Sequence, residues 1–289
     1  MLRLKVWTQA SRPKTLIASA SPVLVGAALA LNTGLFDLTA FLFTMATALC
    51  IQIGTNFAND YFDFVKGADT SARKGPLRVT QAGLVSLREI KVATAITFIL
   101  AALFGCYLIW HSSIAIAFLL ALSILFGIIY TGGPYPLAYL GLGELFVFIF
   151  FGPIAVASTF YLQTQQFSWE AVLAGIPLGA LSSAILVVNN LRDIEEDRAA
   201  GKKTLSVRFG KAFGKFQFTL AIFLAFIPLP FFFRKNPFSM LAVMALLPAL
   251  SVLLAILKNK DPLLLNEALA KTARLLFIYT LLFCIGWML

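Results

Sequence analysis

Histidine and cysteine, which many nucleophilic and zinc sites require, are scarce in this sequence. Its 289 residues include one histidine, His111, and three cysteines that lie far apart in apolar stretches without a Cys-x-x-Cys pair. A zinc site and a disulfide framework are therefore disfavoured. Since no Ser/His or Cys/His arrangement can be recognised, we expect no covalent protein nucleophile either.

Charged residues are scarce as well. They make up 12% of the chain, against 60% for hydrophobic residues, and the mean hydropathy is +0.89. Soluble domains usually carry about 25% charged residues. The net charge of +10 comes from basic residues in short loops between apolar segments, a pattern typical of membrane topology. The sequence therefore predicts an integral membrane protein that contacts the lipid bilayer and binds no nucleic acid.

Nine apolar segments are long enough to cross a bilayer. They run over about 15–32, 38–58, 92–110, 113–131, 140–161, 172–191, 215–233, 238–257 and 272–289. Most are too long for barrel strands and lack strict alternation, so helices are expected. Prolines within or near them predict kinks; these are Pro22, Pro153, Pro177, Pro228 and Pro248. The predicted fold is all-α, with about nine transmembrane helices in a single domain over residues 1–289.

Basic residues are distributed unevenly between the two sides of this arrangement. If the N-terminus is cytoplasmic and nine helices alternate, 21 of the 23 Lys and Arg residues fall on the cytoplasmic side. Only Arg234 and Lys235 fall on the other side. The positive-inside rule therefore predicts a cytoplasmic N-terminus, in a membrane that we expect to be a bacterial inner membrane.

Two polar clusters interrupt the apolar pattern, each directly after an apolar run. Each cluster has an Asn, an Asp four residues later and another Asp beyond; they are Asn56, Asp60 and Asp63, and then Asn189, Asp193 and Asp197. These spacings place each set on about one face of a helix. Acids at the end of a membrane helix are costly unless they are compensated, so both clusters indicate a functional site.

Oxygen atoms from two facing clusters suit a hard cation. The four carboxylates and two amide oxygens would serve as ligands, and Mg²⁺ prefers carboxylates together with substrate phosphates. The loops after the clusters add basic residues, of which Lys74, Arg78 and Lys202 are our candidates for binding a diphosphate. Beside an apolar bundle, such a site fits a diphosphate head with a long hydrocarbon tail, which is a polyprenyl diphosphate.

Simpler interpretations compete with this one. Polar helix ends with charged loops often only mark the membrane boundary, and a single lysine is more often a topology anchor than a ligand. The matching Asn-xxx-Asp spacing of two clusters on one membrane side favours a site. A secondary transporter, with the Asp pairs as cation sites, is the alternative of another class. Its acids would be expected near the bilayer midplane rather than at cytoplasmic helix ends.

The clusters resemble the signatures of the UbiA-type intramembrane prenyltransferases, which are an Asn-xxx-Asp-xx-Asp motif and a later Asp-xxx-Asp motif. Asn56, Asp60 and Asp63 match the first, and Asp193 and Asp197 match the second. Other stretches resemble one branch, the 1,4-dihydroxy-2-naphthoate polyprenyltransferases of menaquinone synthesis. They lie at 11–16, 59–70, 75–81, 130–134, 141–144 and 200–205. The resemblance covers essentially the whole chain.

This resemblance implies nine helices around a central cavity, with two Mg²⁺ ions between carboxylates and diphosphate. The allylic diphosphate would ionise, and the carbocation would attack 1,4-dihydroxy-2-naphthoate, which also loses its carboxylate to give demethylmenaquinone. The catalytic residues it implies are Asp60, Asp63, Asp193 and Asp197.

Three further residues are candidates with open roles. Arg12 would bind the acceptor carboxylate, or serve only as an N-terminal topology anchor. Tyr130 would stabilise the carbocation through its ring face, or only pack at a helix end. Glu144 is an acid in an apolar context, and the sequence assigns it no role.

One departure bears on the acceptor. Hydroxybenzoate-type members carry a Tyr-xxx-Lys pattern after the fourth helix, whereas Tyr130 is followed at the fourth place by Pro134. This disfavours the hydroxybenzoate branch and suits the naphthoate one. Acceptors such as homogentisate, 4-hydroxybenzoate or a chlorophyll precursor remain as alternatives.

Overall fold

The structure is a computed structural model that describes residues 2–68, 75–258 and 264–289. All regular structure within these ranges is helical. In chain order the helices are α1 (Leu2–Ser11), α2 (Pro13–Leu31), α3 (Leu38–Val65), α4 (Leu87–His111), α5 (Ile114–Ile129), α6 (Gly143–Phe150), α7 (Pro153–Thr164), α8 (Trp169–Arg192), α9 (Ile194–Ala199), α10 (Leu205–Phe226), α11 (Leu229–Lys235), the 3₁₀ helix η1 (Pro237–Ala245), α12 (Leu246–Lys258) and α13 (Leu265–Met288).

The membrane spans agree with the prediction from hydropathy. In the described part of the chain, eight helical stretches are long and apolar enough to cross a membrane, and α5 is a shorter apolar helix of 16 residues. Together they account for the nine predicted segments, so the all-α prediction is confirmed. The chain is an integral membrane protein with multiple helical spans.

The predicted kinks have different outcomes. Pro153 begins α7 and Pro228 precedes α11, so both stand where a span is broken into two helices. Pro22 and Pro177 lie inside α2 and α8, which remain continuous. Neighbouring helices and local adjustments can accommodate a proline in a membrane helix.

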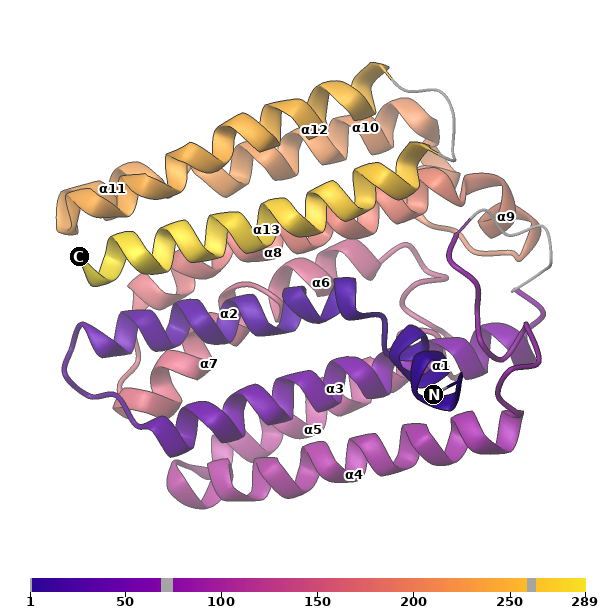
Figure 1. Ribbon diagram of the computed structural model, residues 1–289, viewed down its shortest axis with the longest axis horizontal. Coiled ribbons are helices and arrows are strands. Elements are labelled where there is room, and N and C mark those ends of the chain that lie inside the picture. Colours follow the sequence, from indigo (N-terminus) through magenta and orange to yellow (C-terminus); the bar gives the residue numbers. More distant parts are fainter. Residues whose placement is uncertain (1, 69–74, 259–263) are drawn as a thin grey trace.

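Helix α1 lies outside the predicted apolar segments. Its Trp7 packs edge-to-face against Phe57 of α3, with 5.5 Å between ring centroids, and Ala10 is buried. Arg12 has a φ of 52° and turns the chain into α2, whose first residue is Pro13. Figure 1 shows α1 at the end of the molecule where α3 also ends. A polar N-terminal segment therefore packs against the helix end that carries the first cluster.

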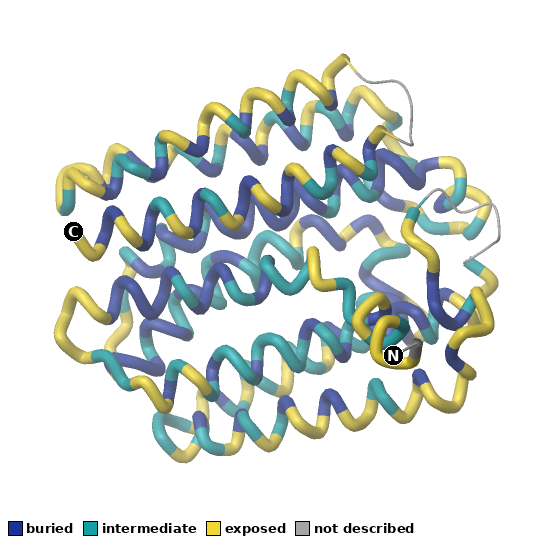
Figure 2. Tube along the Cα trace, in the orientation of Figure 1, coloured by how far each residue is buried: buried dark blue, intermediate teal, exposed yellow. Residues whose placement is uncertain are grey.

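The long helices run roughly alongside one another, and α8 lies at the centre (Figure 1). It packs against α2, α6, α7, α10 and α13. In its apolar stretch of 18 residues, 78% of the residues are buried. Figure 2 shows α8 buried along its length, whereas the outer faces of α4, α10 and α12 are exposed. The C-terminal ends of α3 and α8 lie at the same end of the bundle, with α9 beside them.

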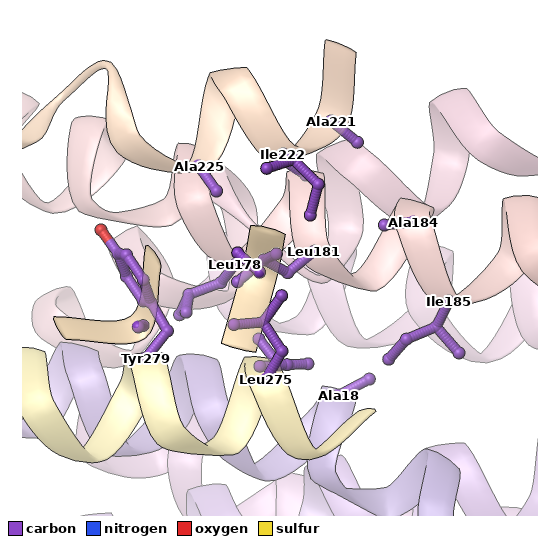
Figure 3. Packing of buried hydrophobic residues seen from close by; sticks show 14 of the residues in the cluster. Ala18, Leu178, Leu181, Ala184, Ile185, Ala221, Ile222, Ala225, Leu275 and Tyr279 are labelled. Atoms are coloured by element: carbon purple, nitrogen blue, oxygen red, sulfur yellow. The ribbon is translucent and has the colours of Figure 1, made fainter. Parts of the chain in front are cut away.

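Apolar side chains from three helices fill the core around α8. Leu178 and Leu181 of α8 meet Ile222 of α10 and Leu275 of α13, and each is at most 4% exposed (Figure 3). Full burial of such a side chain is worth about 1.5–3 kcal/mol relative to water. In a bilayer that term is smaller between helices, and close packing contributes more. This cluster fixes α8 and therefore the position of the second polar cluster at its end.

Helix α8 approaches the break between α6 and α7 closely. A methyl group on Gly179 would lie 2.2 Å from the carbonyl oxygen of Phe148, and one on Gly175 would lie 2.5 Å from the backbone of Pro153. Small residues at such positions let membrane helices pack backbone to backbone.

Gly179→Val is therefore expected to destabilise the protein by about 1–3 kcal/mol, because the added side chain must push the helices apart. Thermal unfolding in detergent measures the effect. Ala121→Val, at an exposed position on α5, is the matched control and should leave the melting temperature unchanged. Equal melting temperatures for both variants would contradict the close approach.

Candidate active site

A cavity of about 610 Å³ opens between the ends of α2, α3 and α8. Its polar lining includes the sequence-predicted residues that the structure describes, namely Arg12, Asn56, Asp60, Asp63, Arg78, Tyr130, Asn189, Asp193, Asp197 and Lys202. Lys74 lies outside the described residues. The same cavity is also lined by apolar side chains that include Leu119, Leu120, Phe126, Phe146 and Phe150. A polar region and a long apolar region therefore share one cavity.

The carboxylates of the first cluster are almost completely buried at the end of α3. Asp60 and Asp63 are each 2% exposed. Asp63 accepts hydrogen bonds from Arg78 Nη2 at 3.3 Å and from the Tyr139 hydroxyl at 3.4 Å. Asp60 lies beside the backbone of Val79 and Thr80, and its Oδ1 is enclosed without a hydrogen-bond partner among the described residues.

The second cluster is organised by Arg192, the last residue of α8. Its guanidinium donates from Nε and Nη2 to both carboxylate oxygens of Asp193, each at 2.6 Å. It also donates to the amide oxygen of Asn189 at 2.7 Å and to that of Asn266 at 2.9 Å. Arg192 is 2% exposed, and such a bidentate pair is both strong and geometrically specific. Arg192 therefore fixes the orientation of Asp193 and Asn189.

Lys202 joins the two clusters. Its Nζ lies 3.2 Å from Asp63 Oδ1 and 3.7 Å from Asp197 Oδ1. Residues that are 134 positions apart in the sequence therefore share one ammonium group. The two clusters meet at one cavity, and their role as metal ligands stays a prediction.

Sequence reasoning missed Tyr139, which organises the basic side chains. The Nζ atoms of Lys66 and Lys202 lie 4.7 Å and 5.2 Å from the centre of its ring, within the range of cation–π attraction. Lys66 also donates to the carbonyl of Thr131 at 2.7 Å. Partial burial lowers the pKa of Lys66, Asp63 opposes that effect, and Lys202 adds to it. Tyr139 lies in the loop before α6, and no spacing relates it to either cluster.

Asn56 and Arg12 connect the N-terminal turn to α3. The Asn56 amide nitrogen donates to the carbonyl of Ser11 at 2.9 Å and to the hydroxyl of Thr15 at 3.0 Å. Arg12 Nη2 donates to the Asn56 carbonyl at 3.3 Å and interacts electrostatically with Asp60. Asn56 thus has a structural role, and its predicted role as a metal ligand is untested. Arg12 lies in the cavity wall, and its predicted role toward the acceptor stays a prediction.

Tyr130 caps α5 and lies in the cavity wall between the two sets of acids. The carboxylates of Glu144, Asp197 and Asp63 interact electrostatically with its hydroxyl. The hydroxyl is therefore placed as a hydrogen-bond donor toward both sets of acids.

The acidic side chains suit a hard cation that is shared with a phosphate ligand. Within the described residues, no three His, Cys, Asp or Glu side chains form a ready-made metal cluster. Instead the ammonium of Lys202 lies between the carboxylates of Asp63 and Asp197. Asp60 Oδ1 is a buried oxygen without a hydrogen-bond partner among the described residues. Mg²⁺ is commonly held by one or two carboxylates plus substrate phosphates, so this donor set fits Mg²⁺ with a diphosphate.

Known proteins resemble the chain in both sequence and fold. It is 36% identical to the 1,4-dihydroxy-2-naphthoate octaprenyltransferase of Escherichia coli (strain K12), over 98% of this chain and 95% of that one. It is 40% identical to the Haemophilus influenzae enzyme of the same name, over 74% and 72% of the two chains. A solved UbiA homologue from Archaeoglobus fulgidus, bound to DMAPP and Mg²⁺, superposes with a TM-score of 0.64 at 14% identity, over 96% of this chain and 98% of that one.

The match to the family extends through the whole bundle and includes both polar clusters. It begins at residue 19, within α2, and ends at residue 287, within α13. The chain therefore belongs to the UbiA prenyltransferase family, and it is a prenyltransferase.

Proposed function

We propose that this prenyltransferase transfers a polyprenyl group from a polyprenyl diphosphate to 1,4-dihydroxy-2-naphthoate, with loss of the carboxylate, to give demethylmenaquinone. The observation that carries the proposal is the joining of two acid clusters through Lys202 at the polar end of an apolar cavity. The names and the 36–40% identities of the Escherichia coli and Haemophilus influenzae relatives support this acceptor.

The diphosphate would bind where the acids and basic groups meet. Asp60, Asp63, Asp193 and Asp197 would hold Mg²⁺, with Asn56 and Asn189 as further candidates. When bound, the metal neutralises the charge that develops on the leaving diphosphate. Arg78 and Lys202, which now contact Asp63, would turn part of their hydrogen bonding to diphosphate oxygens. The apolar side chains deeper in the cavity would bind the prenyl chain.

The bond changes of the reaction need no protein nucleophile. The allylic carbon–oxygen bond breaks with its electron pair leaving on the diphosphate, a ring carbon of the acceptor bonds to the allylic carbon, and the carboxylate departs as carbon dioxide. Arg12 would bind the acceptor carboxylate, and the Tyr130 ring would stabilise the allylic cation. The position of both side chains in the cavity lining supports these roles.

The same prenyl transfer could use an acceptor other than the naphthoate. Homogentisate, 4-hydroxybenzoate and chlorophyll precursors are the alternatives, and Pro134 in place of a lysine disfavours hydroxybenzoate. Lys66, which lies beside Tyr139 and Asp63, supplies a cation instead at the polar end of the cavity, which we call the mouth. Family membership favours an enzyme over a cation-coupled transporter.

An acceptor assay tests the proposal directly. Purified protein with a labelled polyprenyl diphosphate should prenylate dihydroxynaphthoate only when Mg²⁺ is present, and chelation should stop the reaction. Homogentisate and 4-hydroxybenzoate are the comparison acceptors in the same detergent. Transfer to hydroxybenzoate without transfer to dihydroxynaphthoate would overturn the assignment.

Tyr139 should affect diphosphate binding through the two lysines. Tyr139→Leu removes the ring that both ammonium groups contact, so the KM for the prenyl diphosphate is expected to rise by about 2- to 30-fold. Tyr139→Phe keeps the ring and loses only the long hydrogen bond to Asp63, so its effect should be smaller. An equal KM for both variants would show that the ring is not what positions the lysines.

We also propose that the mouth faces the cytoplasm and that the whole chain is one domain. The polar end of the cavity holds Arg12, Arg78, Arg192 and Lys202, and Lys66 lies nearby over the Tyr139 ring, whereas Arg234 and Lys235 lie at the end of α11. Such an asymmetry is typical of a cytoplasmic face. The family match over residues 19–287 supports a single unit, and a bacterial inner membrane agrees with the bacterial relatives.

A further inference from the structure

Glu144 is a buried acid that the chemistry described so far does not use. It is the second residue of α6, is 7% exposed and lines the cavity. Asn190 of α8 donates to its Oε1 at 2.9 Å, and the Ser183 hydroxyl donates to its backbone carbonyl at 2.8 Å. These contacts hold Glu144 in a fixed position against α8.

The second carboxylate oxygen of Glu144 faces the cavity. Apart from the backbone N–H of Glu144 itself, Asn190 is the group among the described residues that hydrogen-bonds the carboxylate, and Oε2 is not among their fully enclosed polar atoms. Since the residue as a whole is more than nine-tenths buried, the cavity is the space from which this oxygen can be reached. One oxygen is therefore held in place while the other is presented to a ligand.

Glu144 also has no basic partner among the described residues, unlike three of the acids at the polar end of the cavity. Asp63, Asp193 and Asp197 each contact a Lys or Arg, whereas Glu144 forms no ion pair within the described part of the chain. Phe146, Val147 and Phe150 line the cavity beside it. An unpaired acid in an apolar, membrane-embedded setting is costly, which indicates that a bound ligand completes its hydrogen bonding.

The position of Glu144 separates it from the diphosphate region while keeping it close. A methyl group on Gly143 would lie 3.0 Å from the Tyr130 hydroxyl, so Tyr130 and the start of α6 are neighbours. Tyr130 in turn feels the charges of Asp63 and Asp197. Tyr130 therefore lies between Glu144 and the acid clusters. In the proposed reaction the aromatic ring of the acceptor must lie beside these clusters, near Glu144, to meet the allylic carbon.

We propose that Glu144 accepts a hydrogen bond from a phenolic hydroxyl of the aromatic acceptor and so orients the ring toward the allylic carbon. The inference rests on the proposed function, because it names a contact of the same acceptor. A carboxyl oxygen that accepts a hydrogen bond is satisfied by an O–H donor and not by a diphosphate, whose oxygens are acceptors, so it favours a hydroxylated arene. No covalent bond to Glu144 forms, and the hydrogen bond raises the electron density of the ring that attacks.

The test combines Glu144→Gln with acceptors that lack one hydroxyl. Glu144→Gln is expected to lower kcat/KM for dihydroxynaphthoate by about 10- to 100-fold, the worth of a hydrogen bond to a charged group. Binding of the prenyl diphosphate with Mg²⁺, measured by calorimetry, should be unchanged. For one of the two monohydroxy-2-naphthoates, wild type and variant should have similar kcat/KM. Any loss of ring reactivity is common to both proteins and cancels in that comparison.

Each outcome bears on one statement only. If wild-type protein does not prenylate dihydroxynaphthoate, the proposed function fails. The other outcome assumes that wild type prenylates dihydroxynaphthoate. If Glu144→Gln then lowers kcat/KM by the same factor for dihydroxynaphthoate and for both monohydroxy-2-naphthoates, the proposed contact with a hydroxyl is overturned. Glu170→Gln, at the other end of α8, is the matched control and should retain wild-type kcat/KM.

A measurement on the wild-type protein covers the case in which Glu144→Gln does not fold. A hydrophobic carbodiimide labels buried carboxyl groups, and mass spectrometry locates the label. Dihydroxynaphthoate, added to protein that already holds Mg²⁺ and a non-hydrolysable prenyl diphosphate analogue, should slow labelling of Glu144. Labelling at an unchanged rate in the presence of saturating acceptor would overturn the proposal.

Discussion

Asp60→Ala is expected to lower prenyl transfer by roughly 1000-fold or more, because it removes a proposed ligand of the metal that would neutralise the leaving group. Asp60 is 2% exposed, and its Oδ1 has no hydrogen-bond partner among the described residues. It forms no salt bridge within them, and the cation that interacts with it electrostatically, Arg12, is only partly buried and keeps its hydrogen bond to the Asn56 carbonyl. Activity should therefore fall much more than stability.

The measurement is the rate of transfer at saturating Mg²⁺, together with thermal unfolding in detergent. Asp60→Asn is the conservative companion, because it keeps the shape of the side chain and removes the charge. Both variants should bind Mg²⁺ and diphosphate weakly while melting close to the wild type. Near-normal turnover in either one would remove Asp60 from the proposed metal site.

Arg192→Ala is expected to have the largest effect on stability. Arg192 holds both oxygens of Asp193 and the amides of Asn189 and Asn266, and its side chain is 1% exposed. Removing one member of a buried ion pair leaves the other charge uncompensated, which typically costs about 3–5 kcal/mol. The same argument predicts that Asp193→Ala loses stability as well as activity, unlike Asp60→Ala.

Thermal or denaturant unfolding of the purified protein measures this difference. Arg198→Ala is the matched control, since Arg198 pairs with Glu195 at 3.0 Å on an exposed surface, with side chains 56% and 62% exposed. Such pairs contribute at most about 1 kcal/mol. If Arg192→Ala and Arg198→Ala melt at the same temperature, the buried pair does not stabilise the fold.

Hydropathy predicted the fold because lipid imposes one rule on every spanning segment. Backbone polar groups must be satisfied within the segment, so a long apolar run such as that of α4 or α13 becomes a helix. Pro153 predicted the kink between α6 and α7, but not how closely α8 packs against Gly152 there. Helix α1 was missed since its sequence is not apolar, and its contact with Phe57 is remote in the chain.

The parts of the candidate site that lie within one helix could be predicted from the sequence, whereas contacts between distant segments could not. The i, i+4 spacing of Asn56 and Asp60 can be read from the sequence, because a helix turns that spacing into one face. The placement of Lys202 between Asp63 and Asp197 depends on how α3 and α8 are packed. Tyr139 was not found for the same reason, since nothing local marks its contact with two lysines.

The salt bridges of Lys202 have a consequence for the order of ligand binding. Lys202 and Arg78 together place two positive charges beside the carboxylates of Asp63 and Asp197, so these charges largely cancel before any ligand binds. A metal ion arriving alone meets a cation in its place, and a diphosphate arriving alone meets buried acids. Each ligand therefore brings the counter-charge that the other needs, and the site favours the binding of Mg²⁺ and diphosphate together. We expect the affinity for Mg²⁺ to be low until a diphosphate accompanies it.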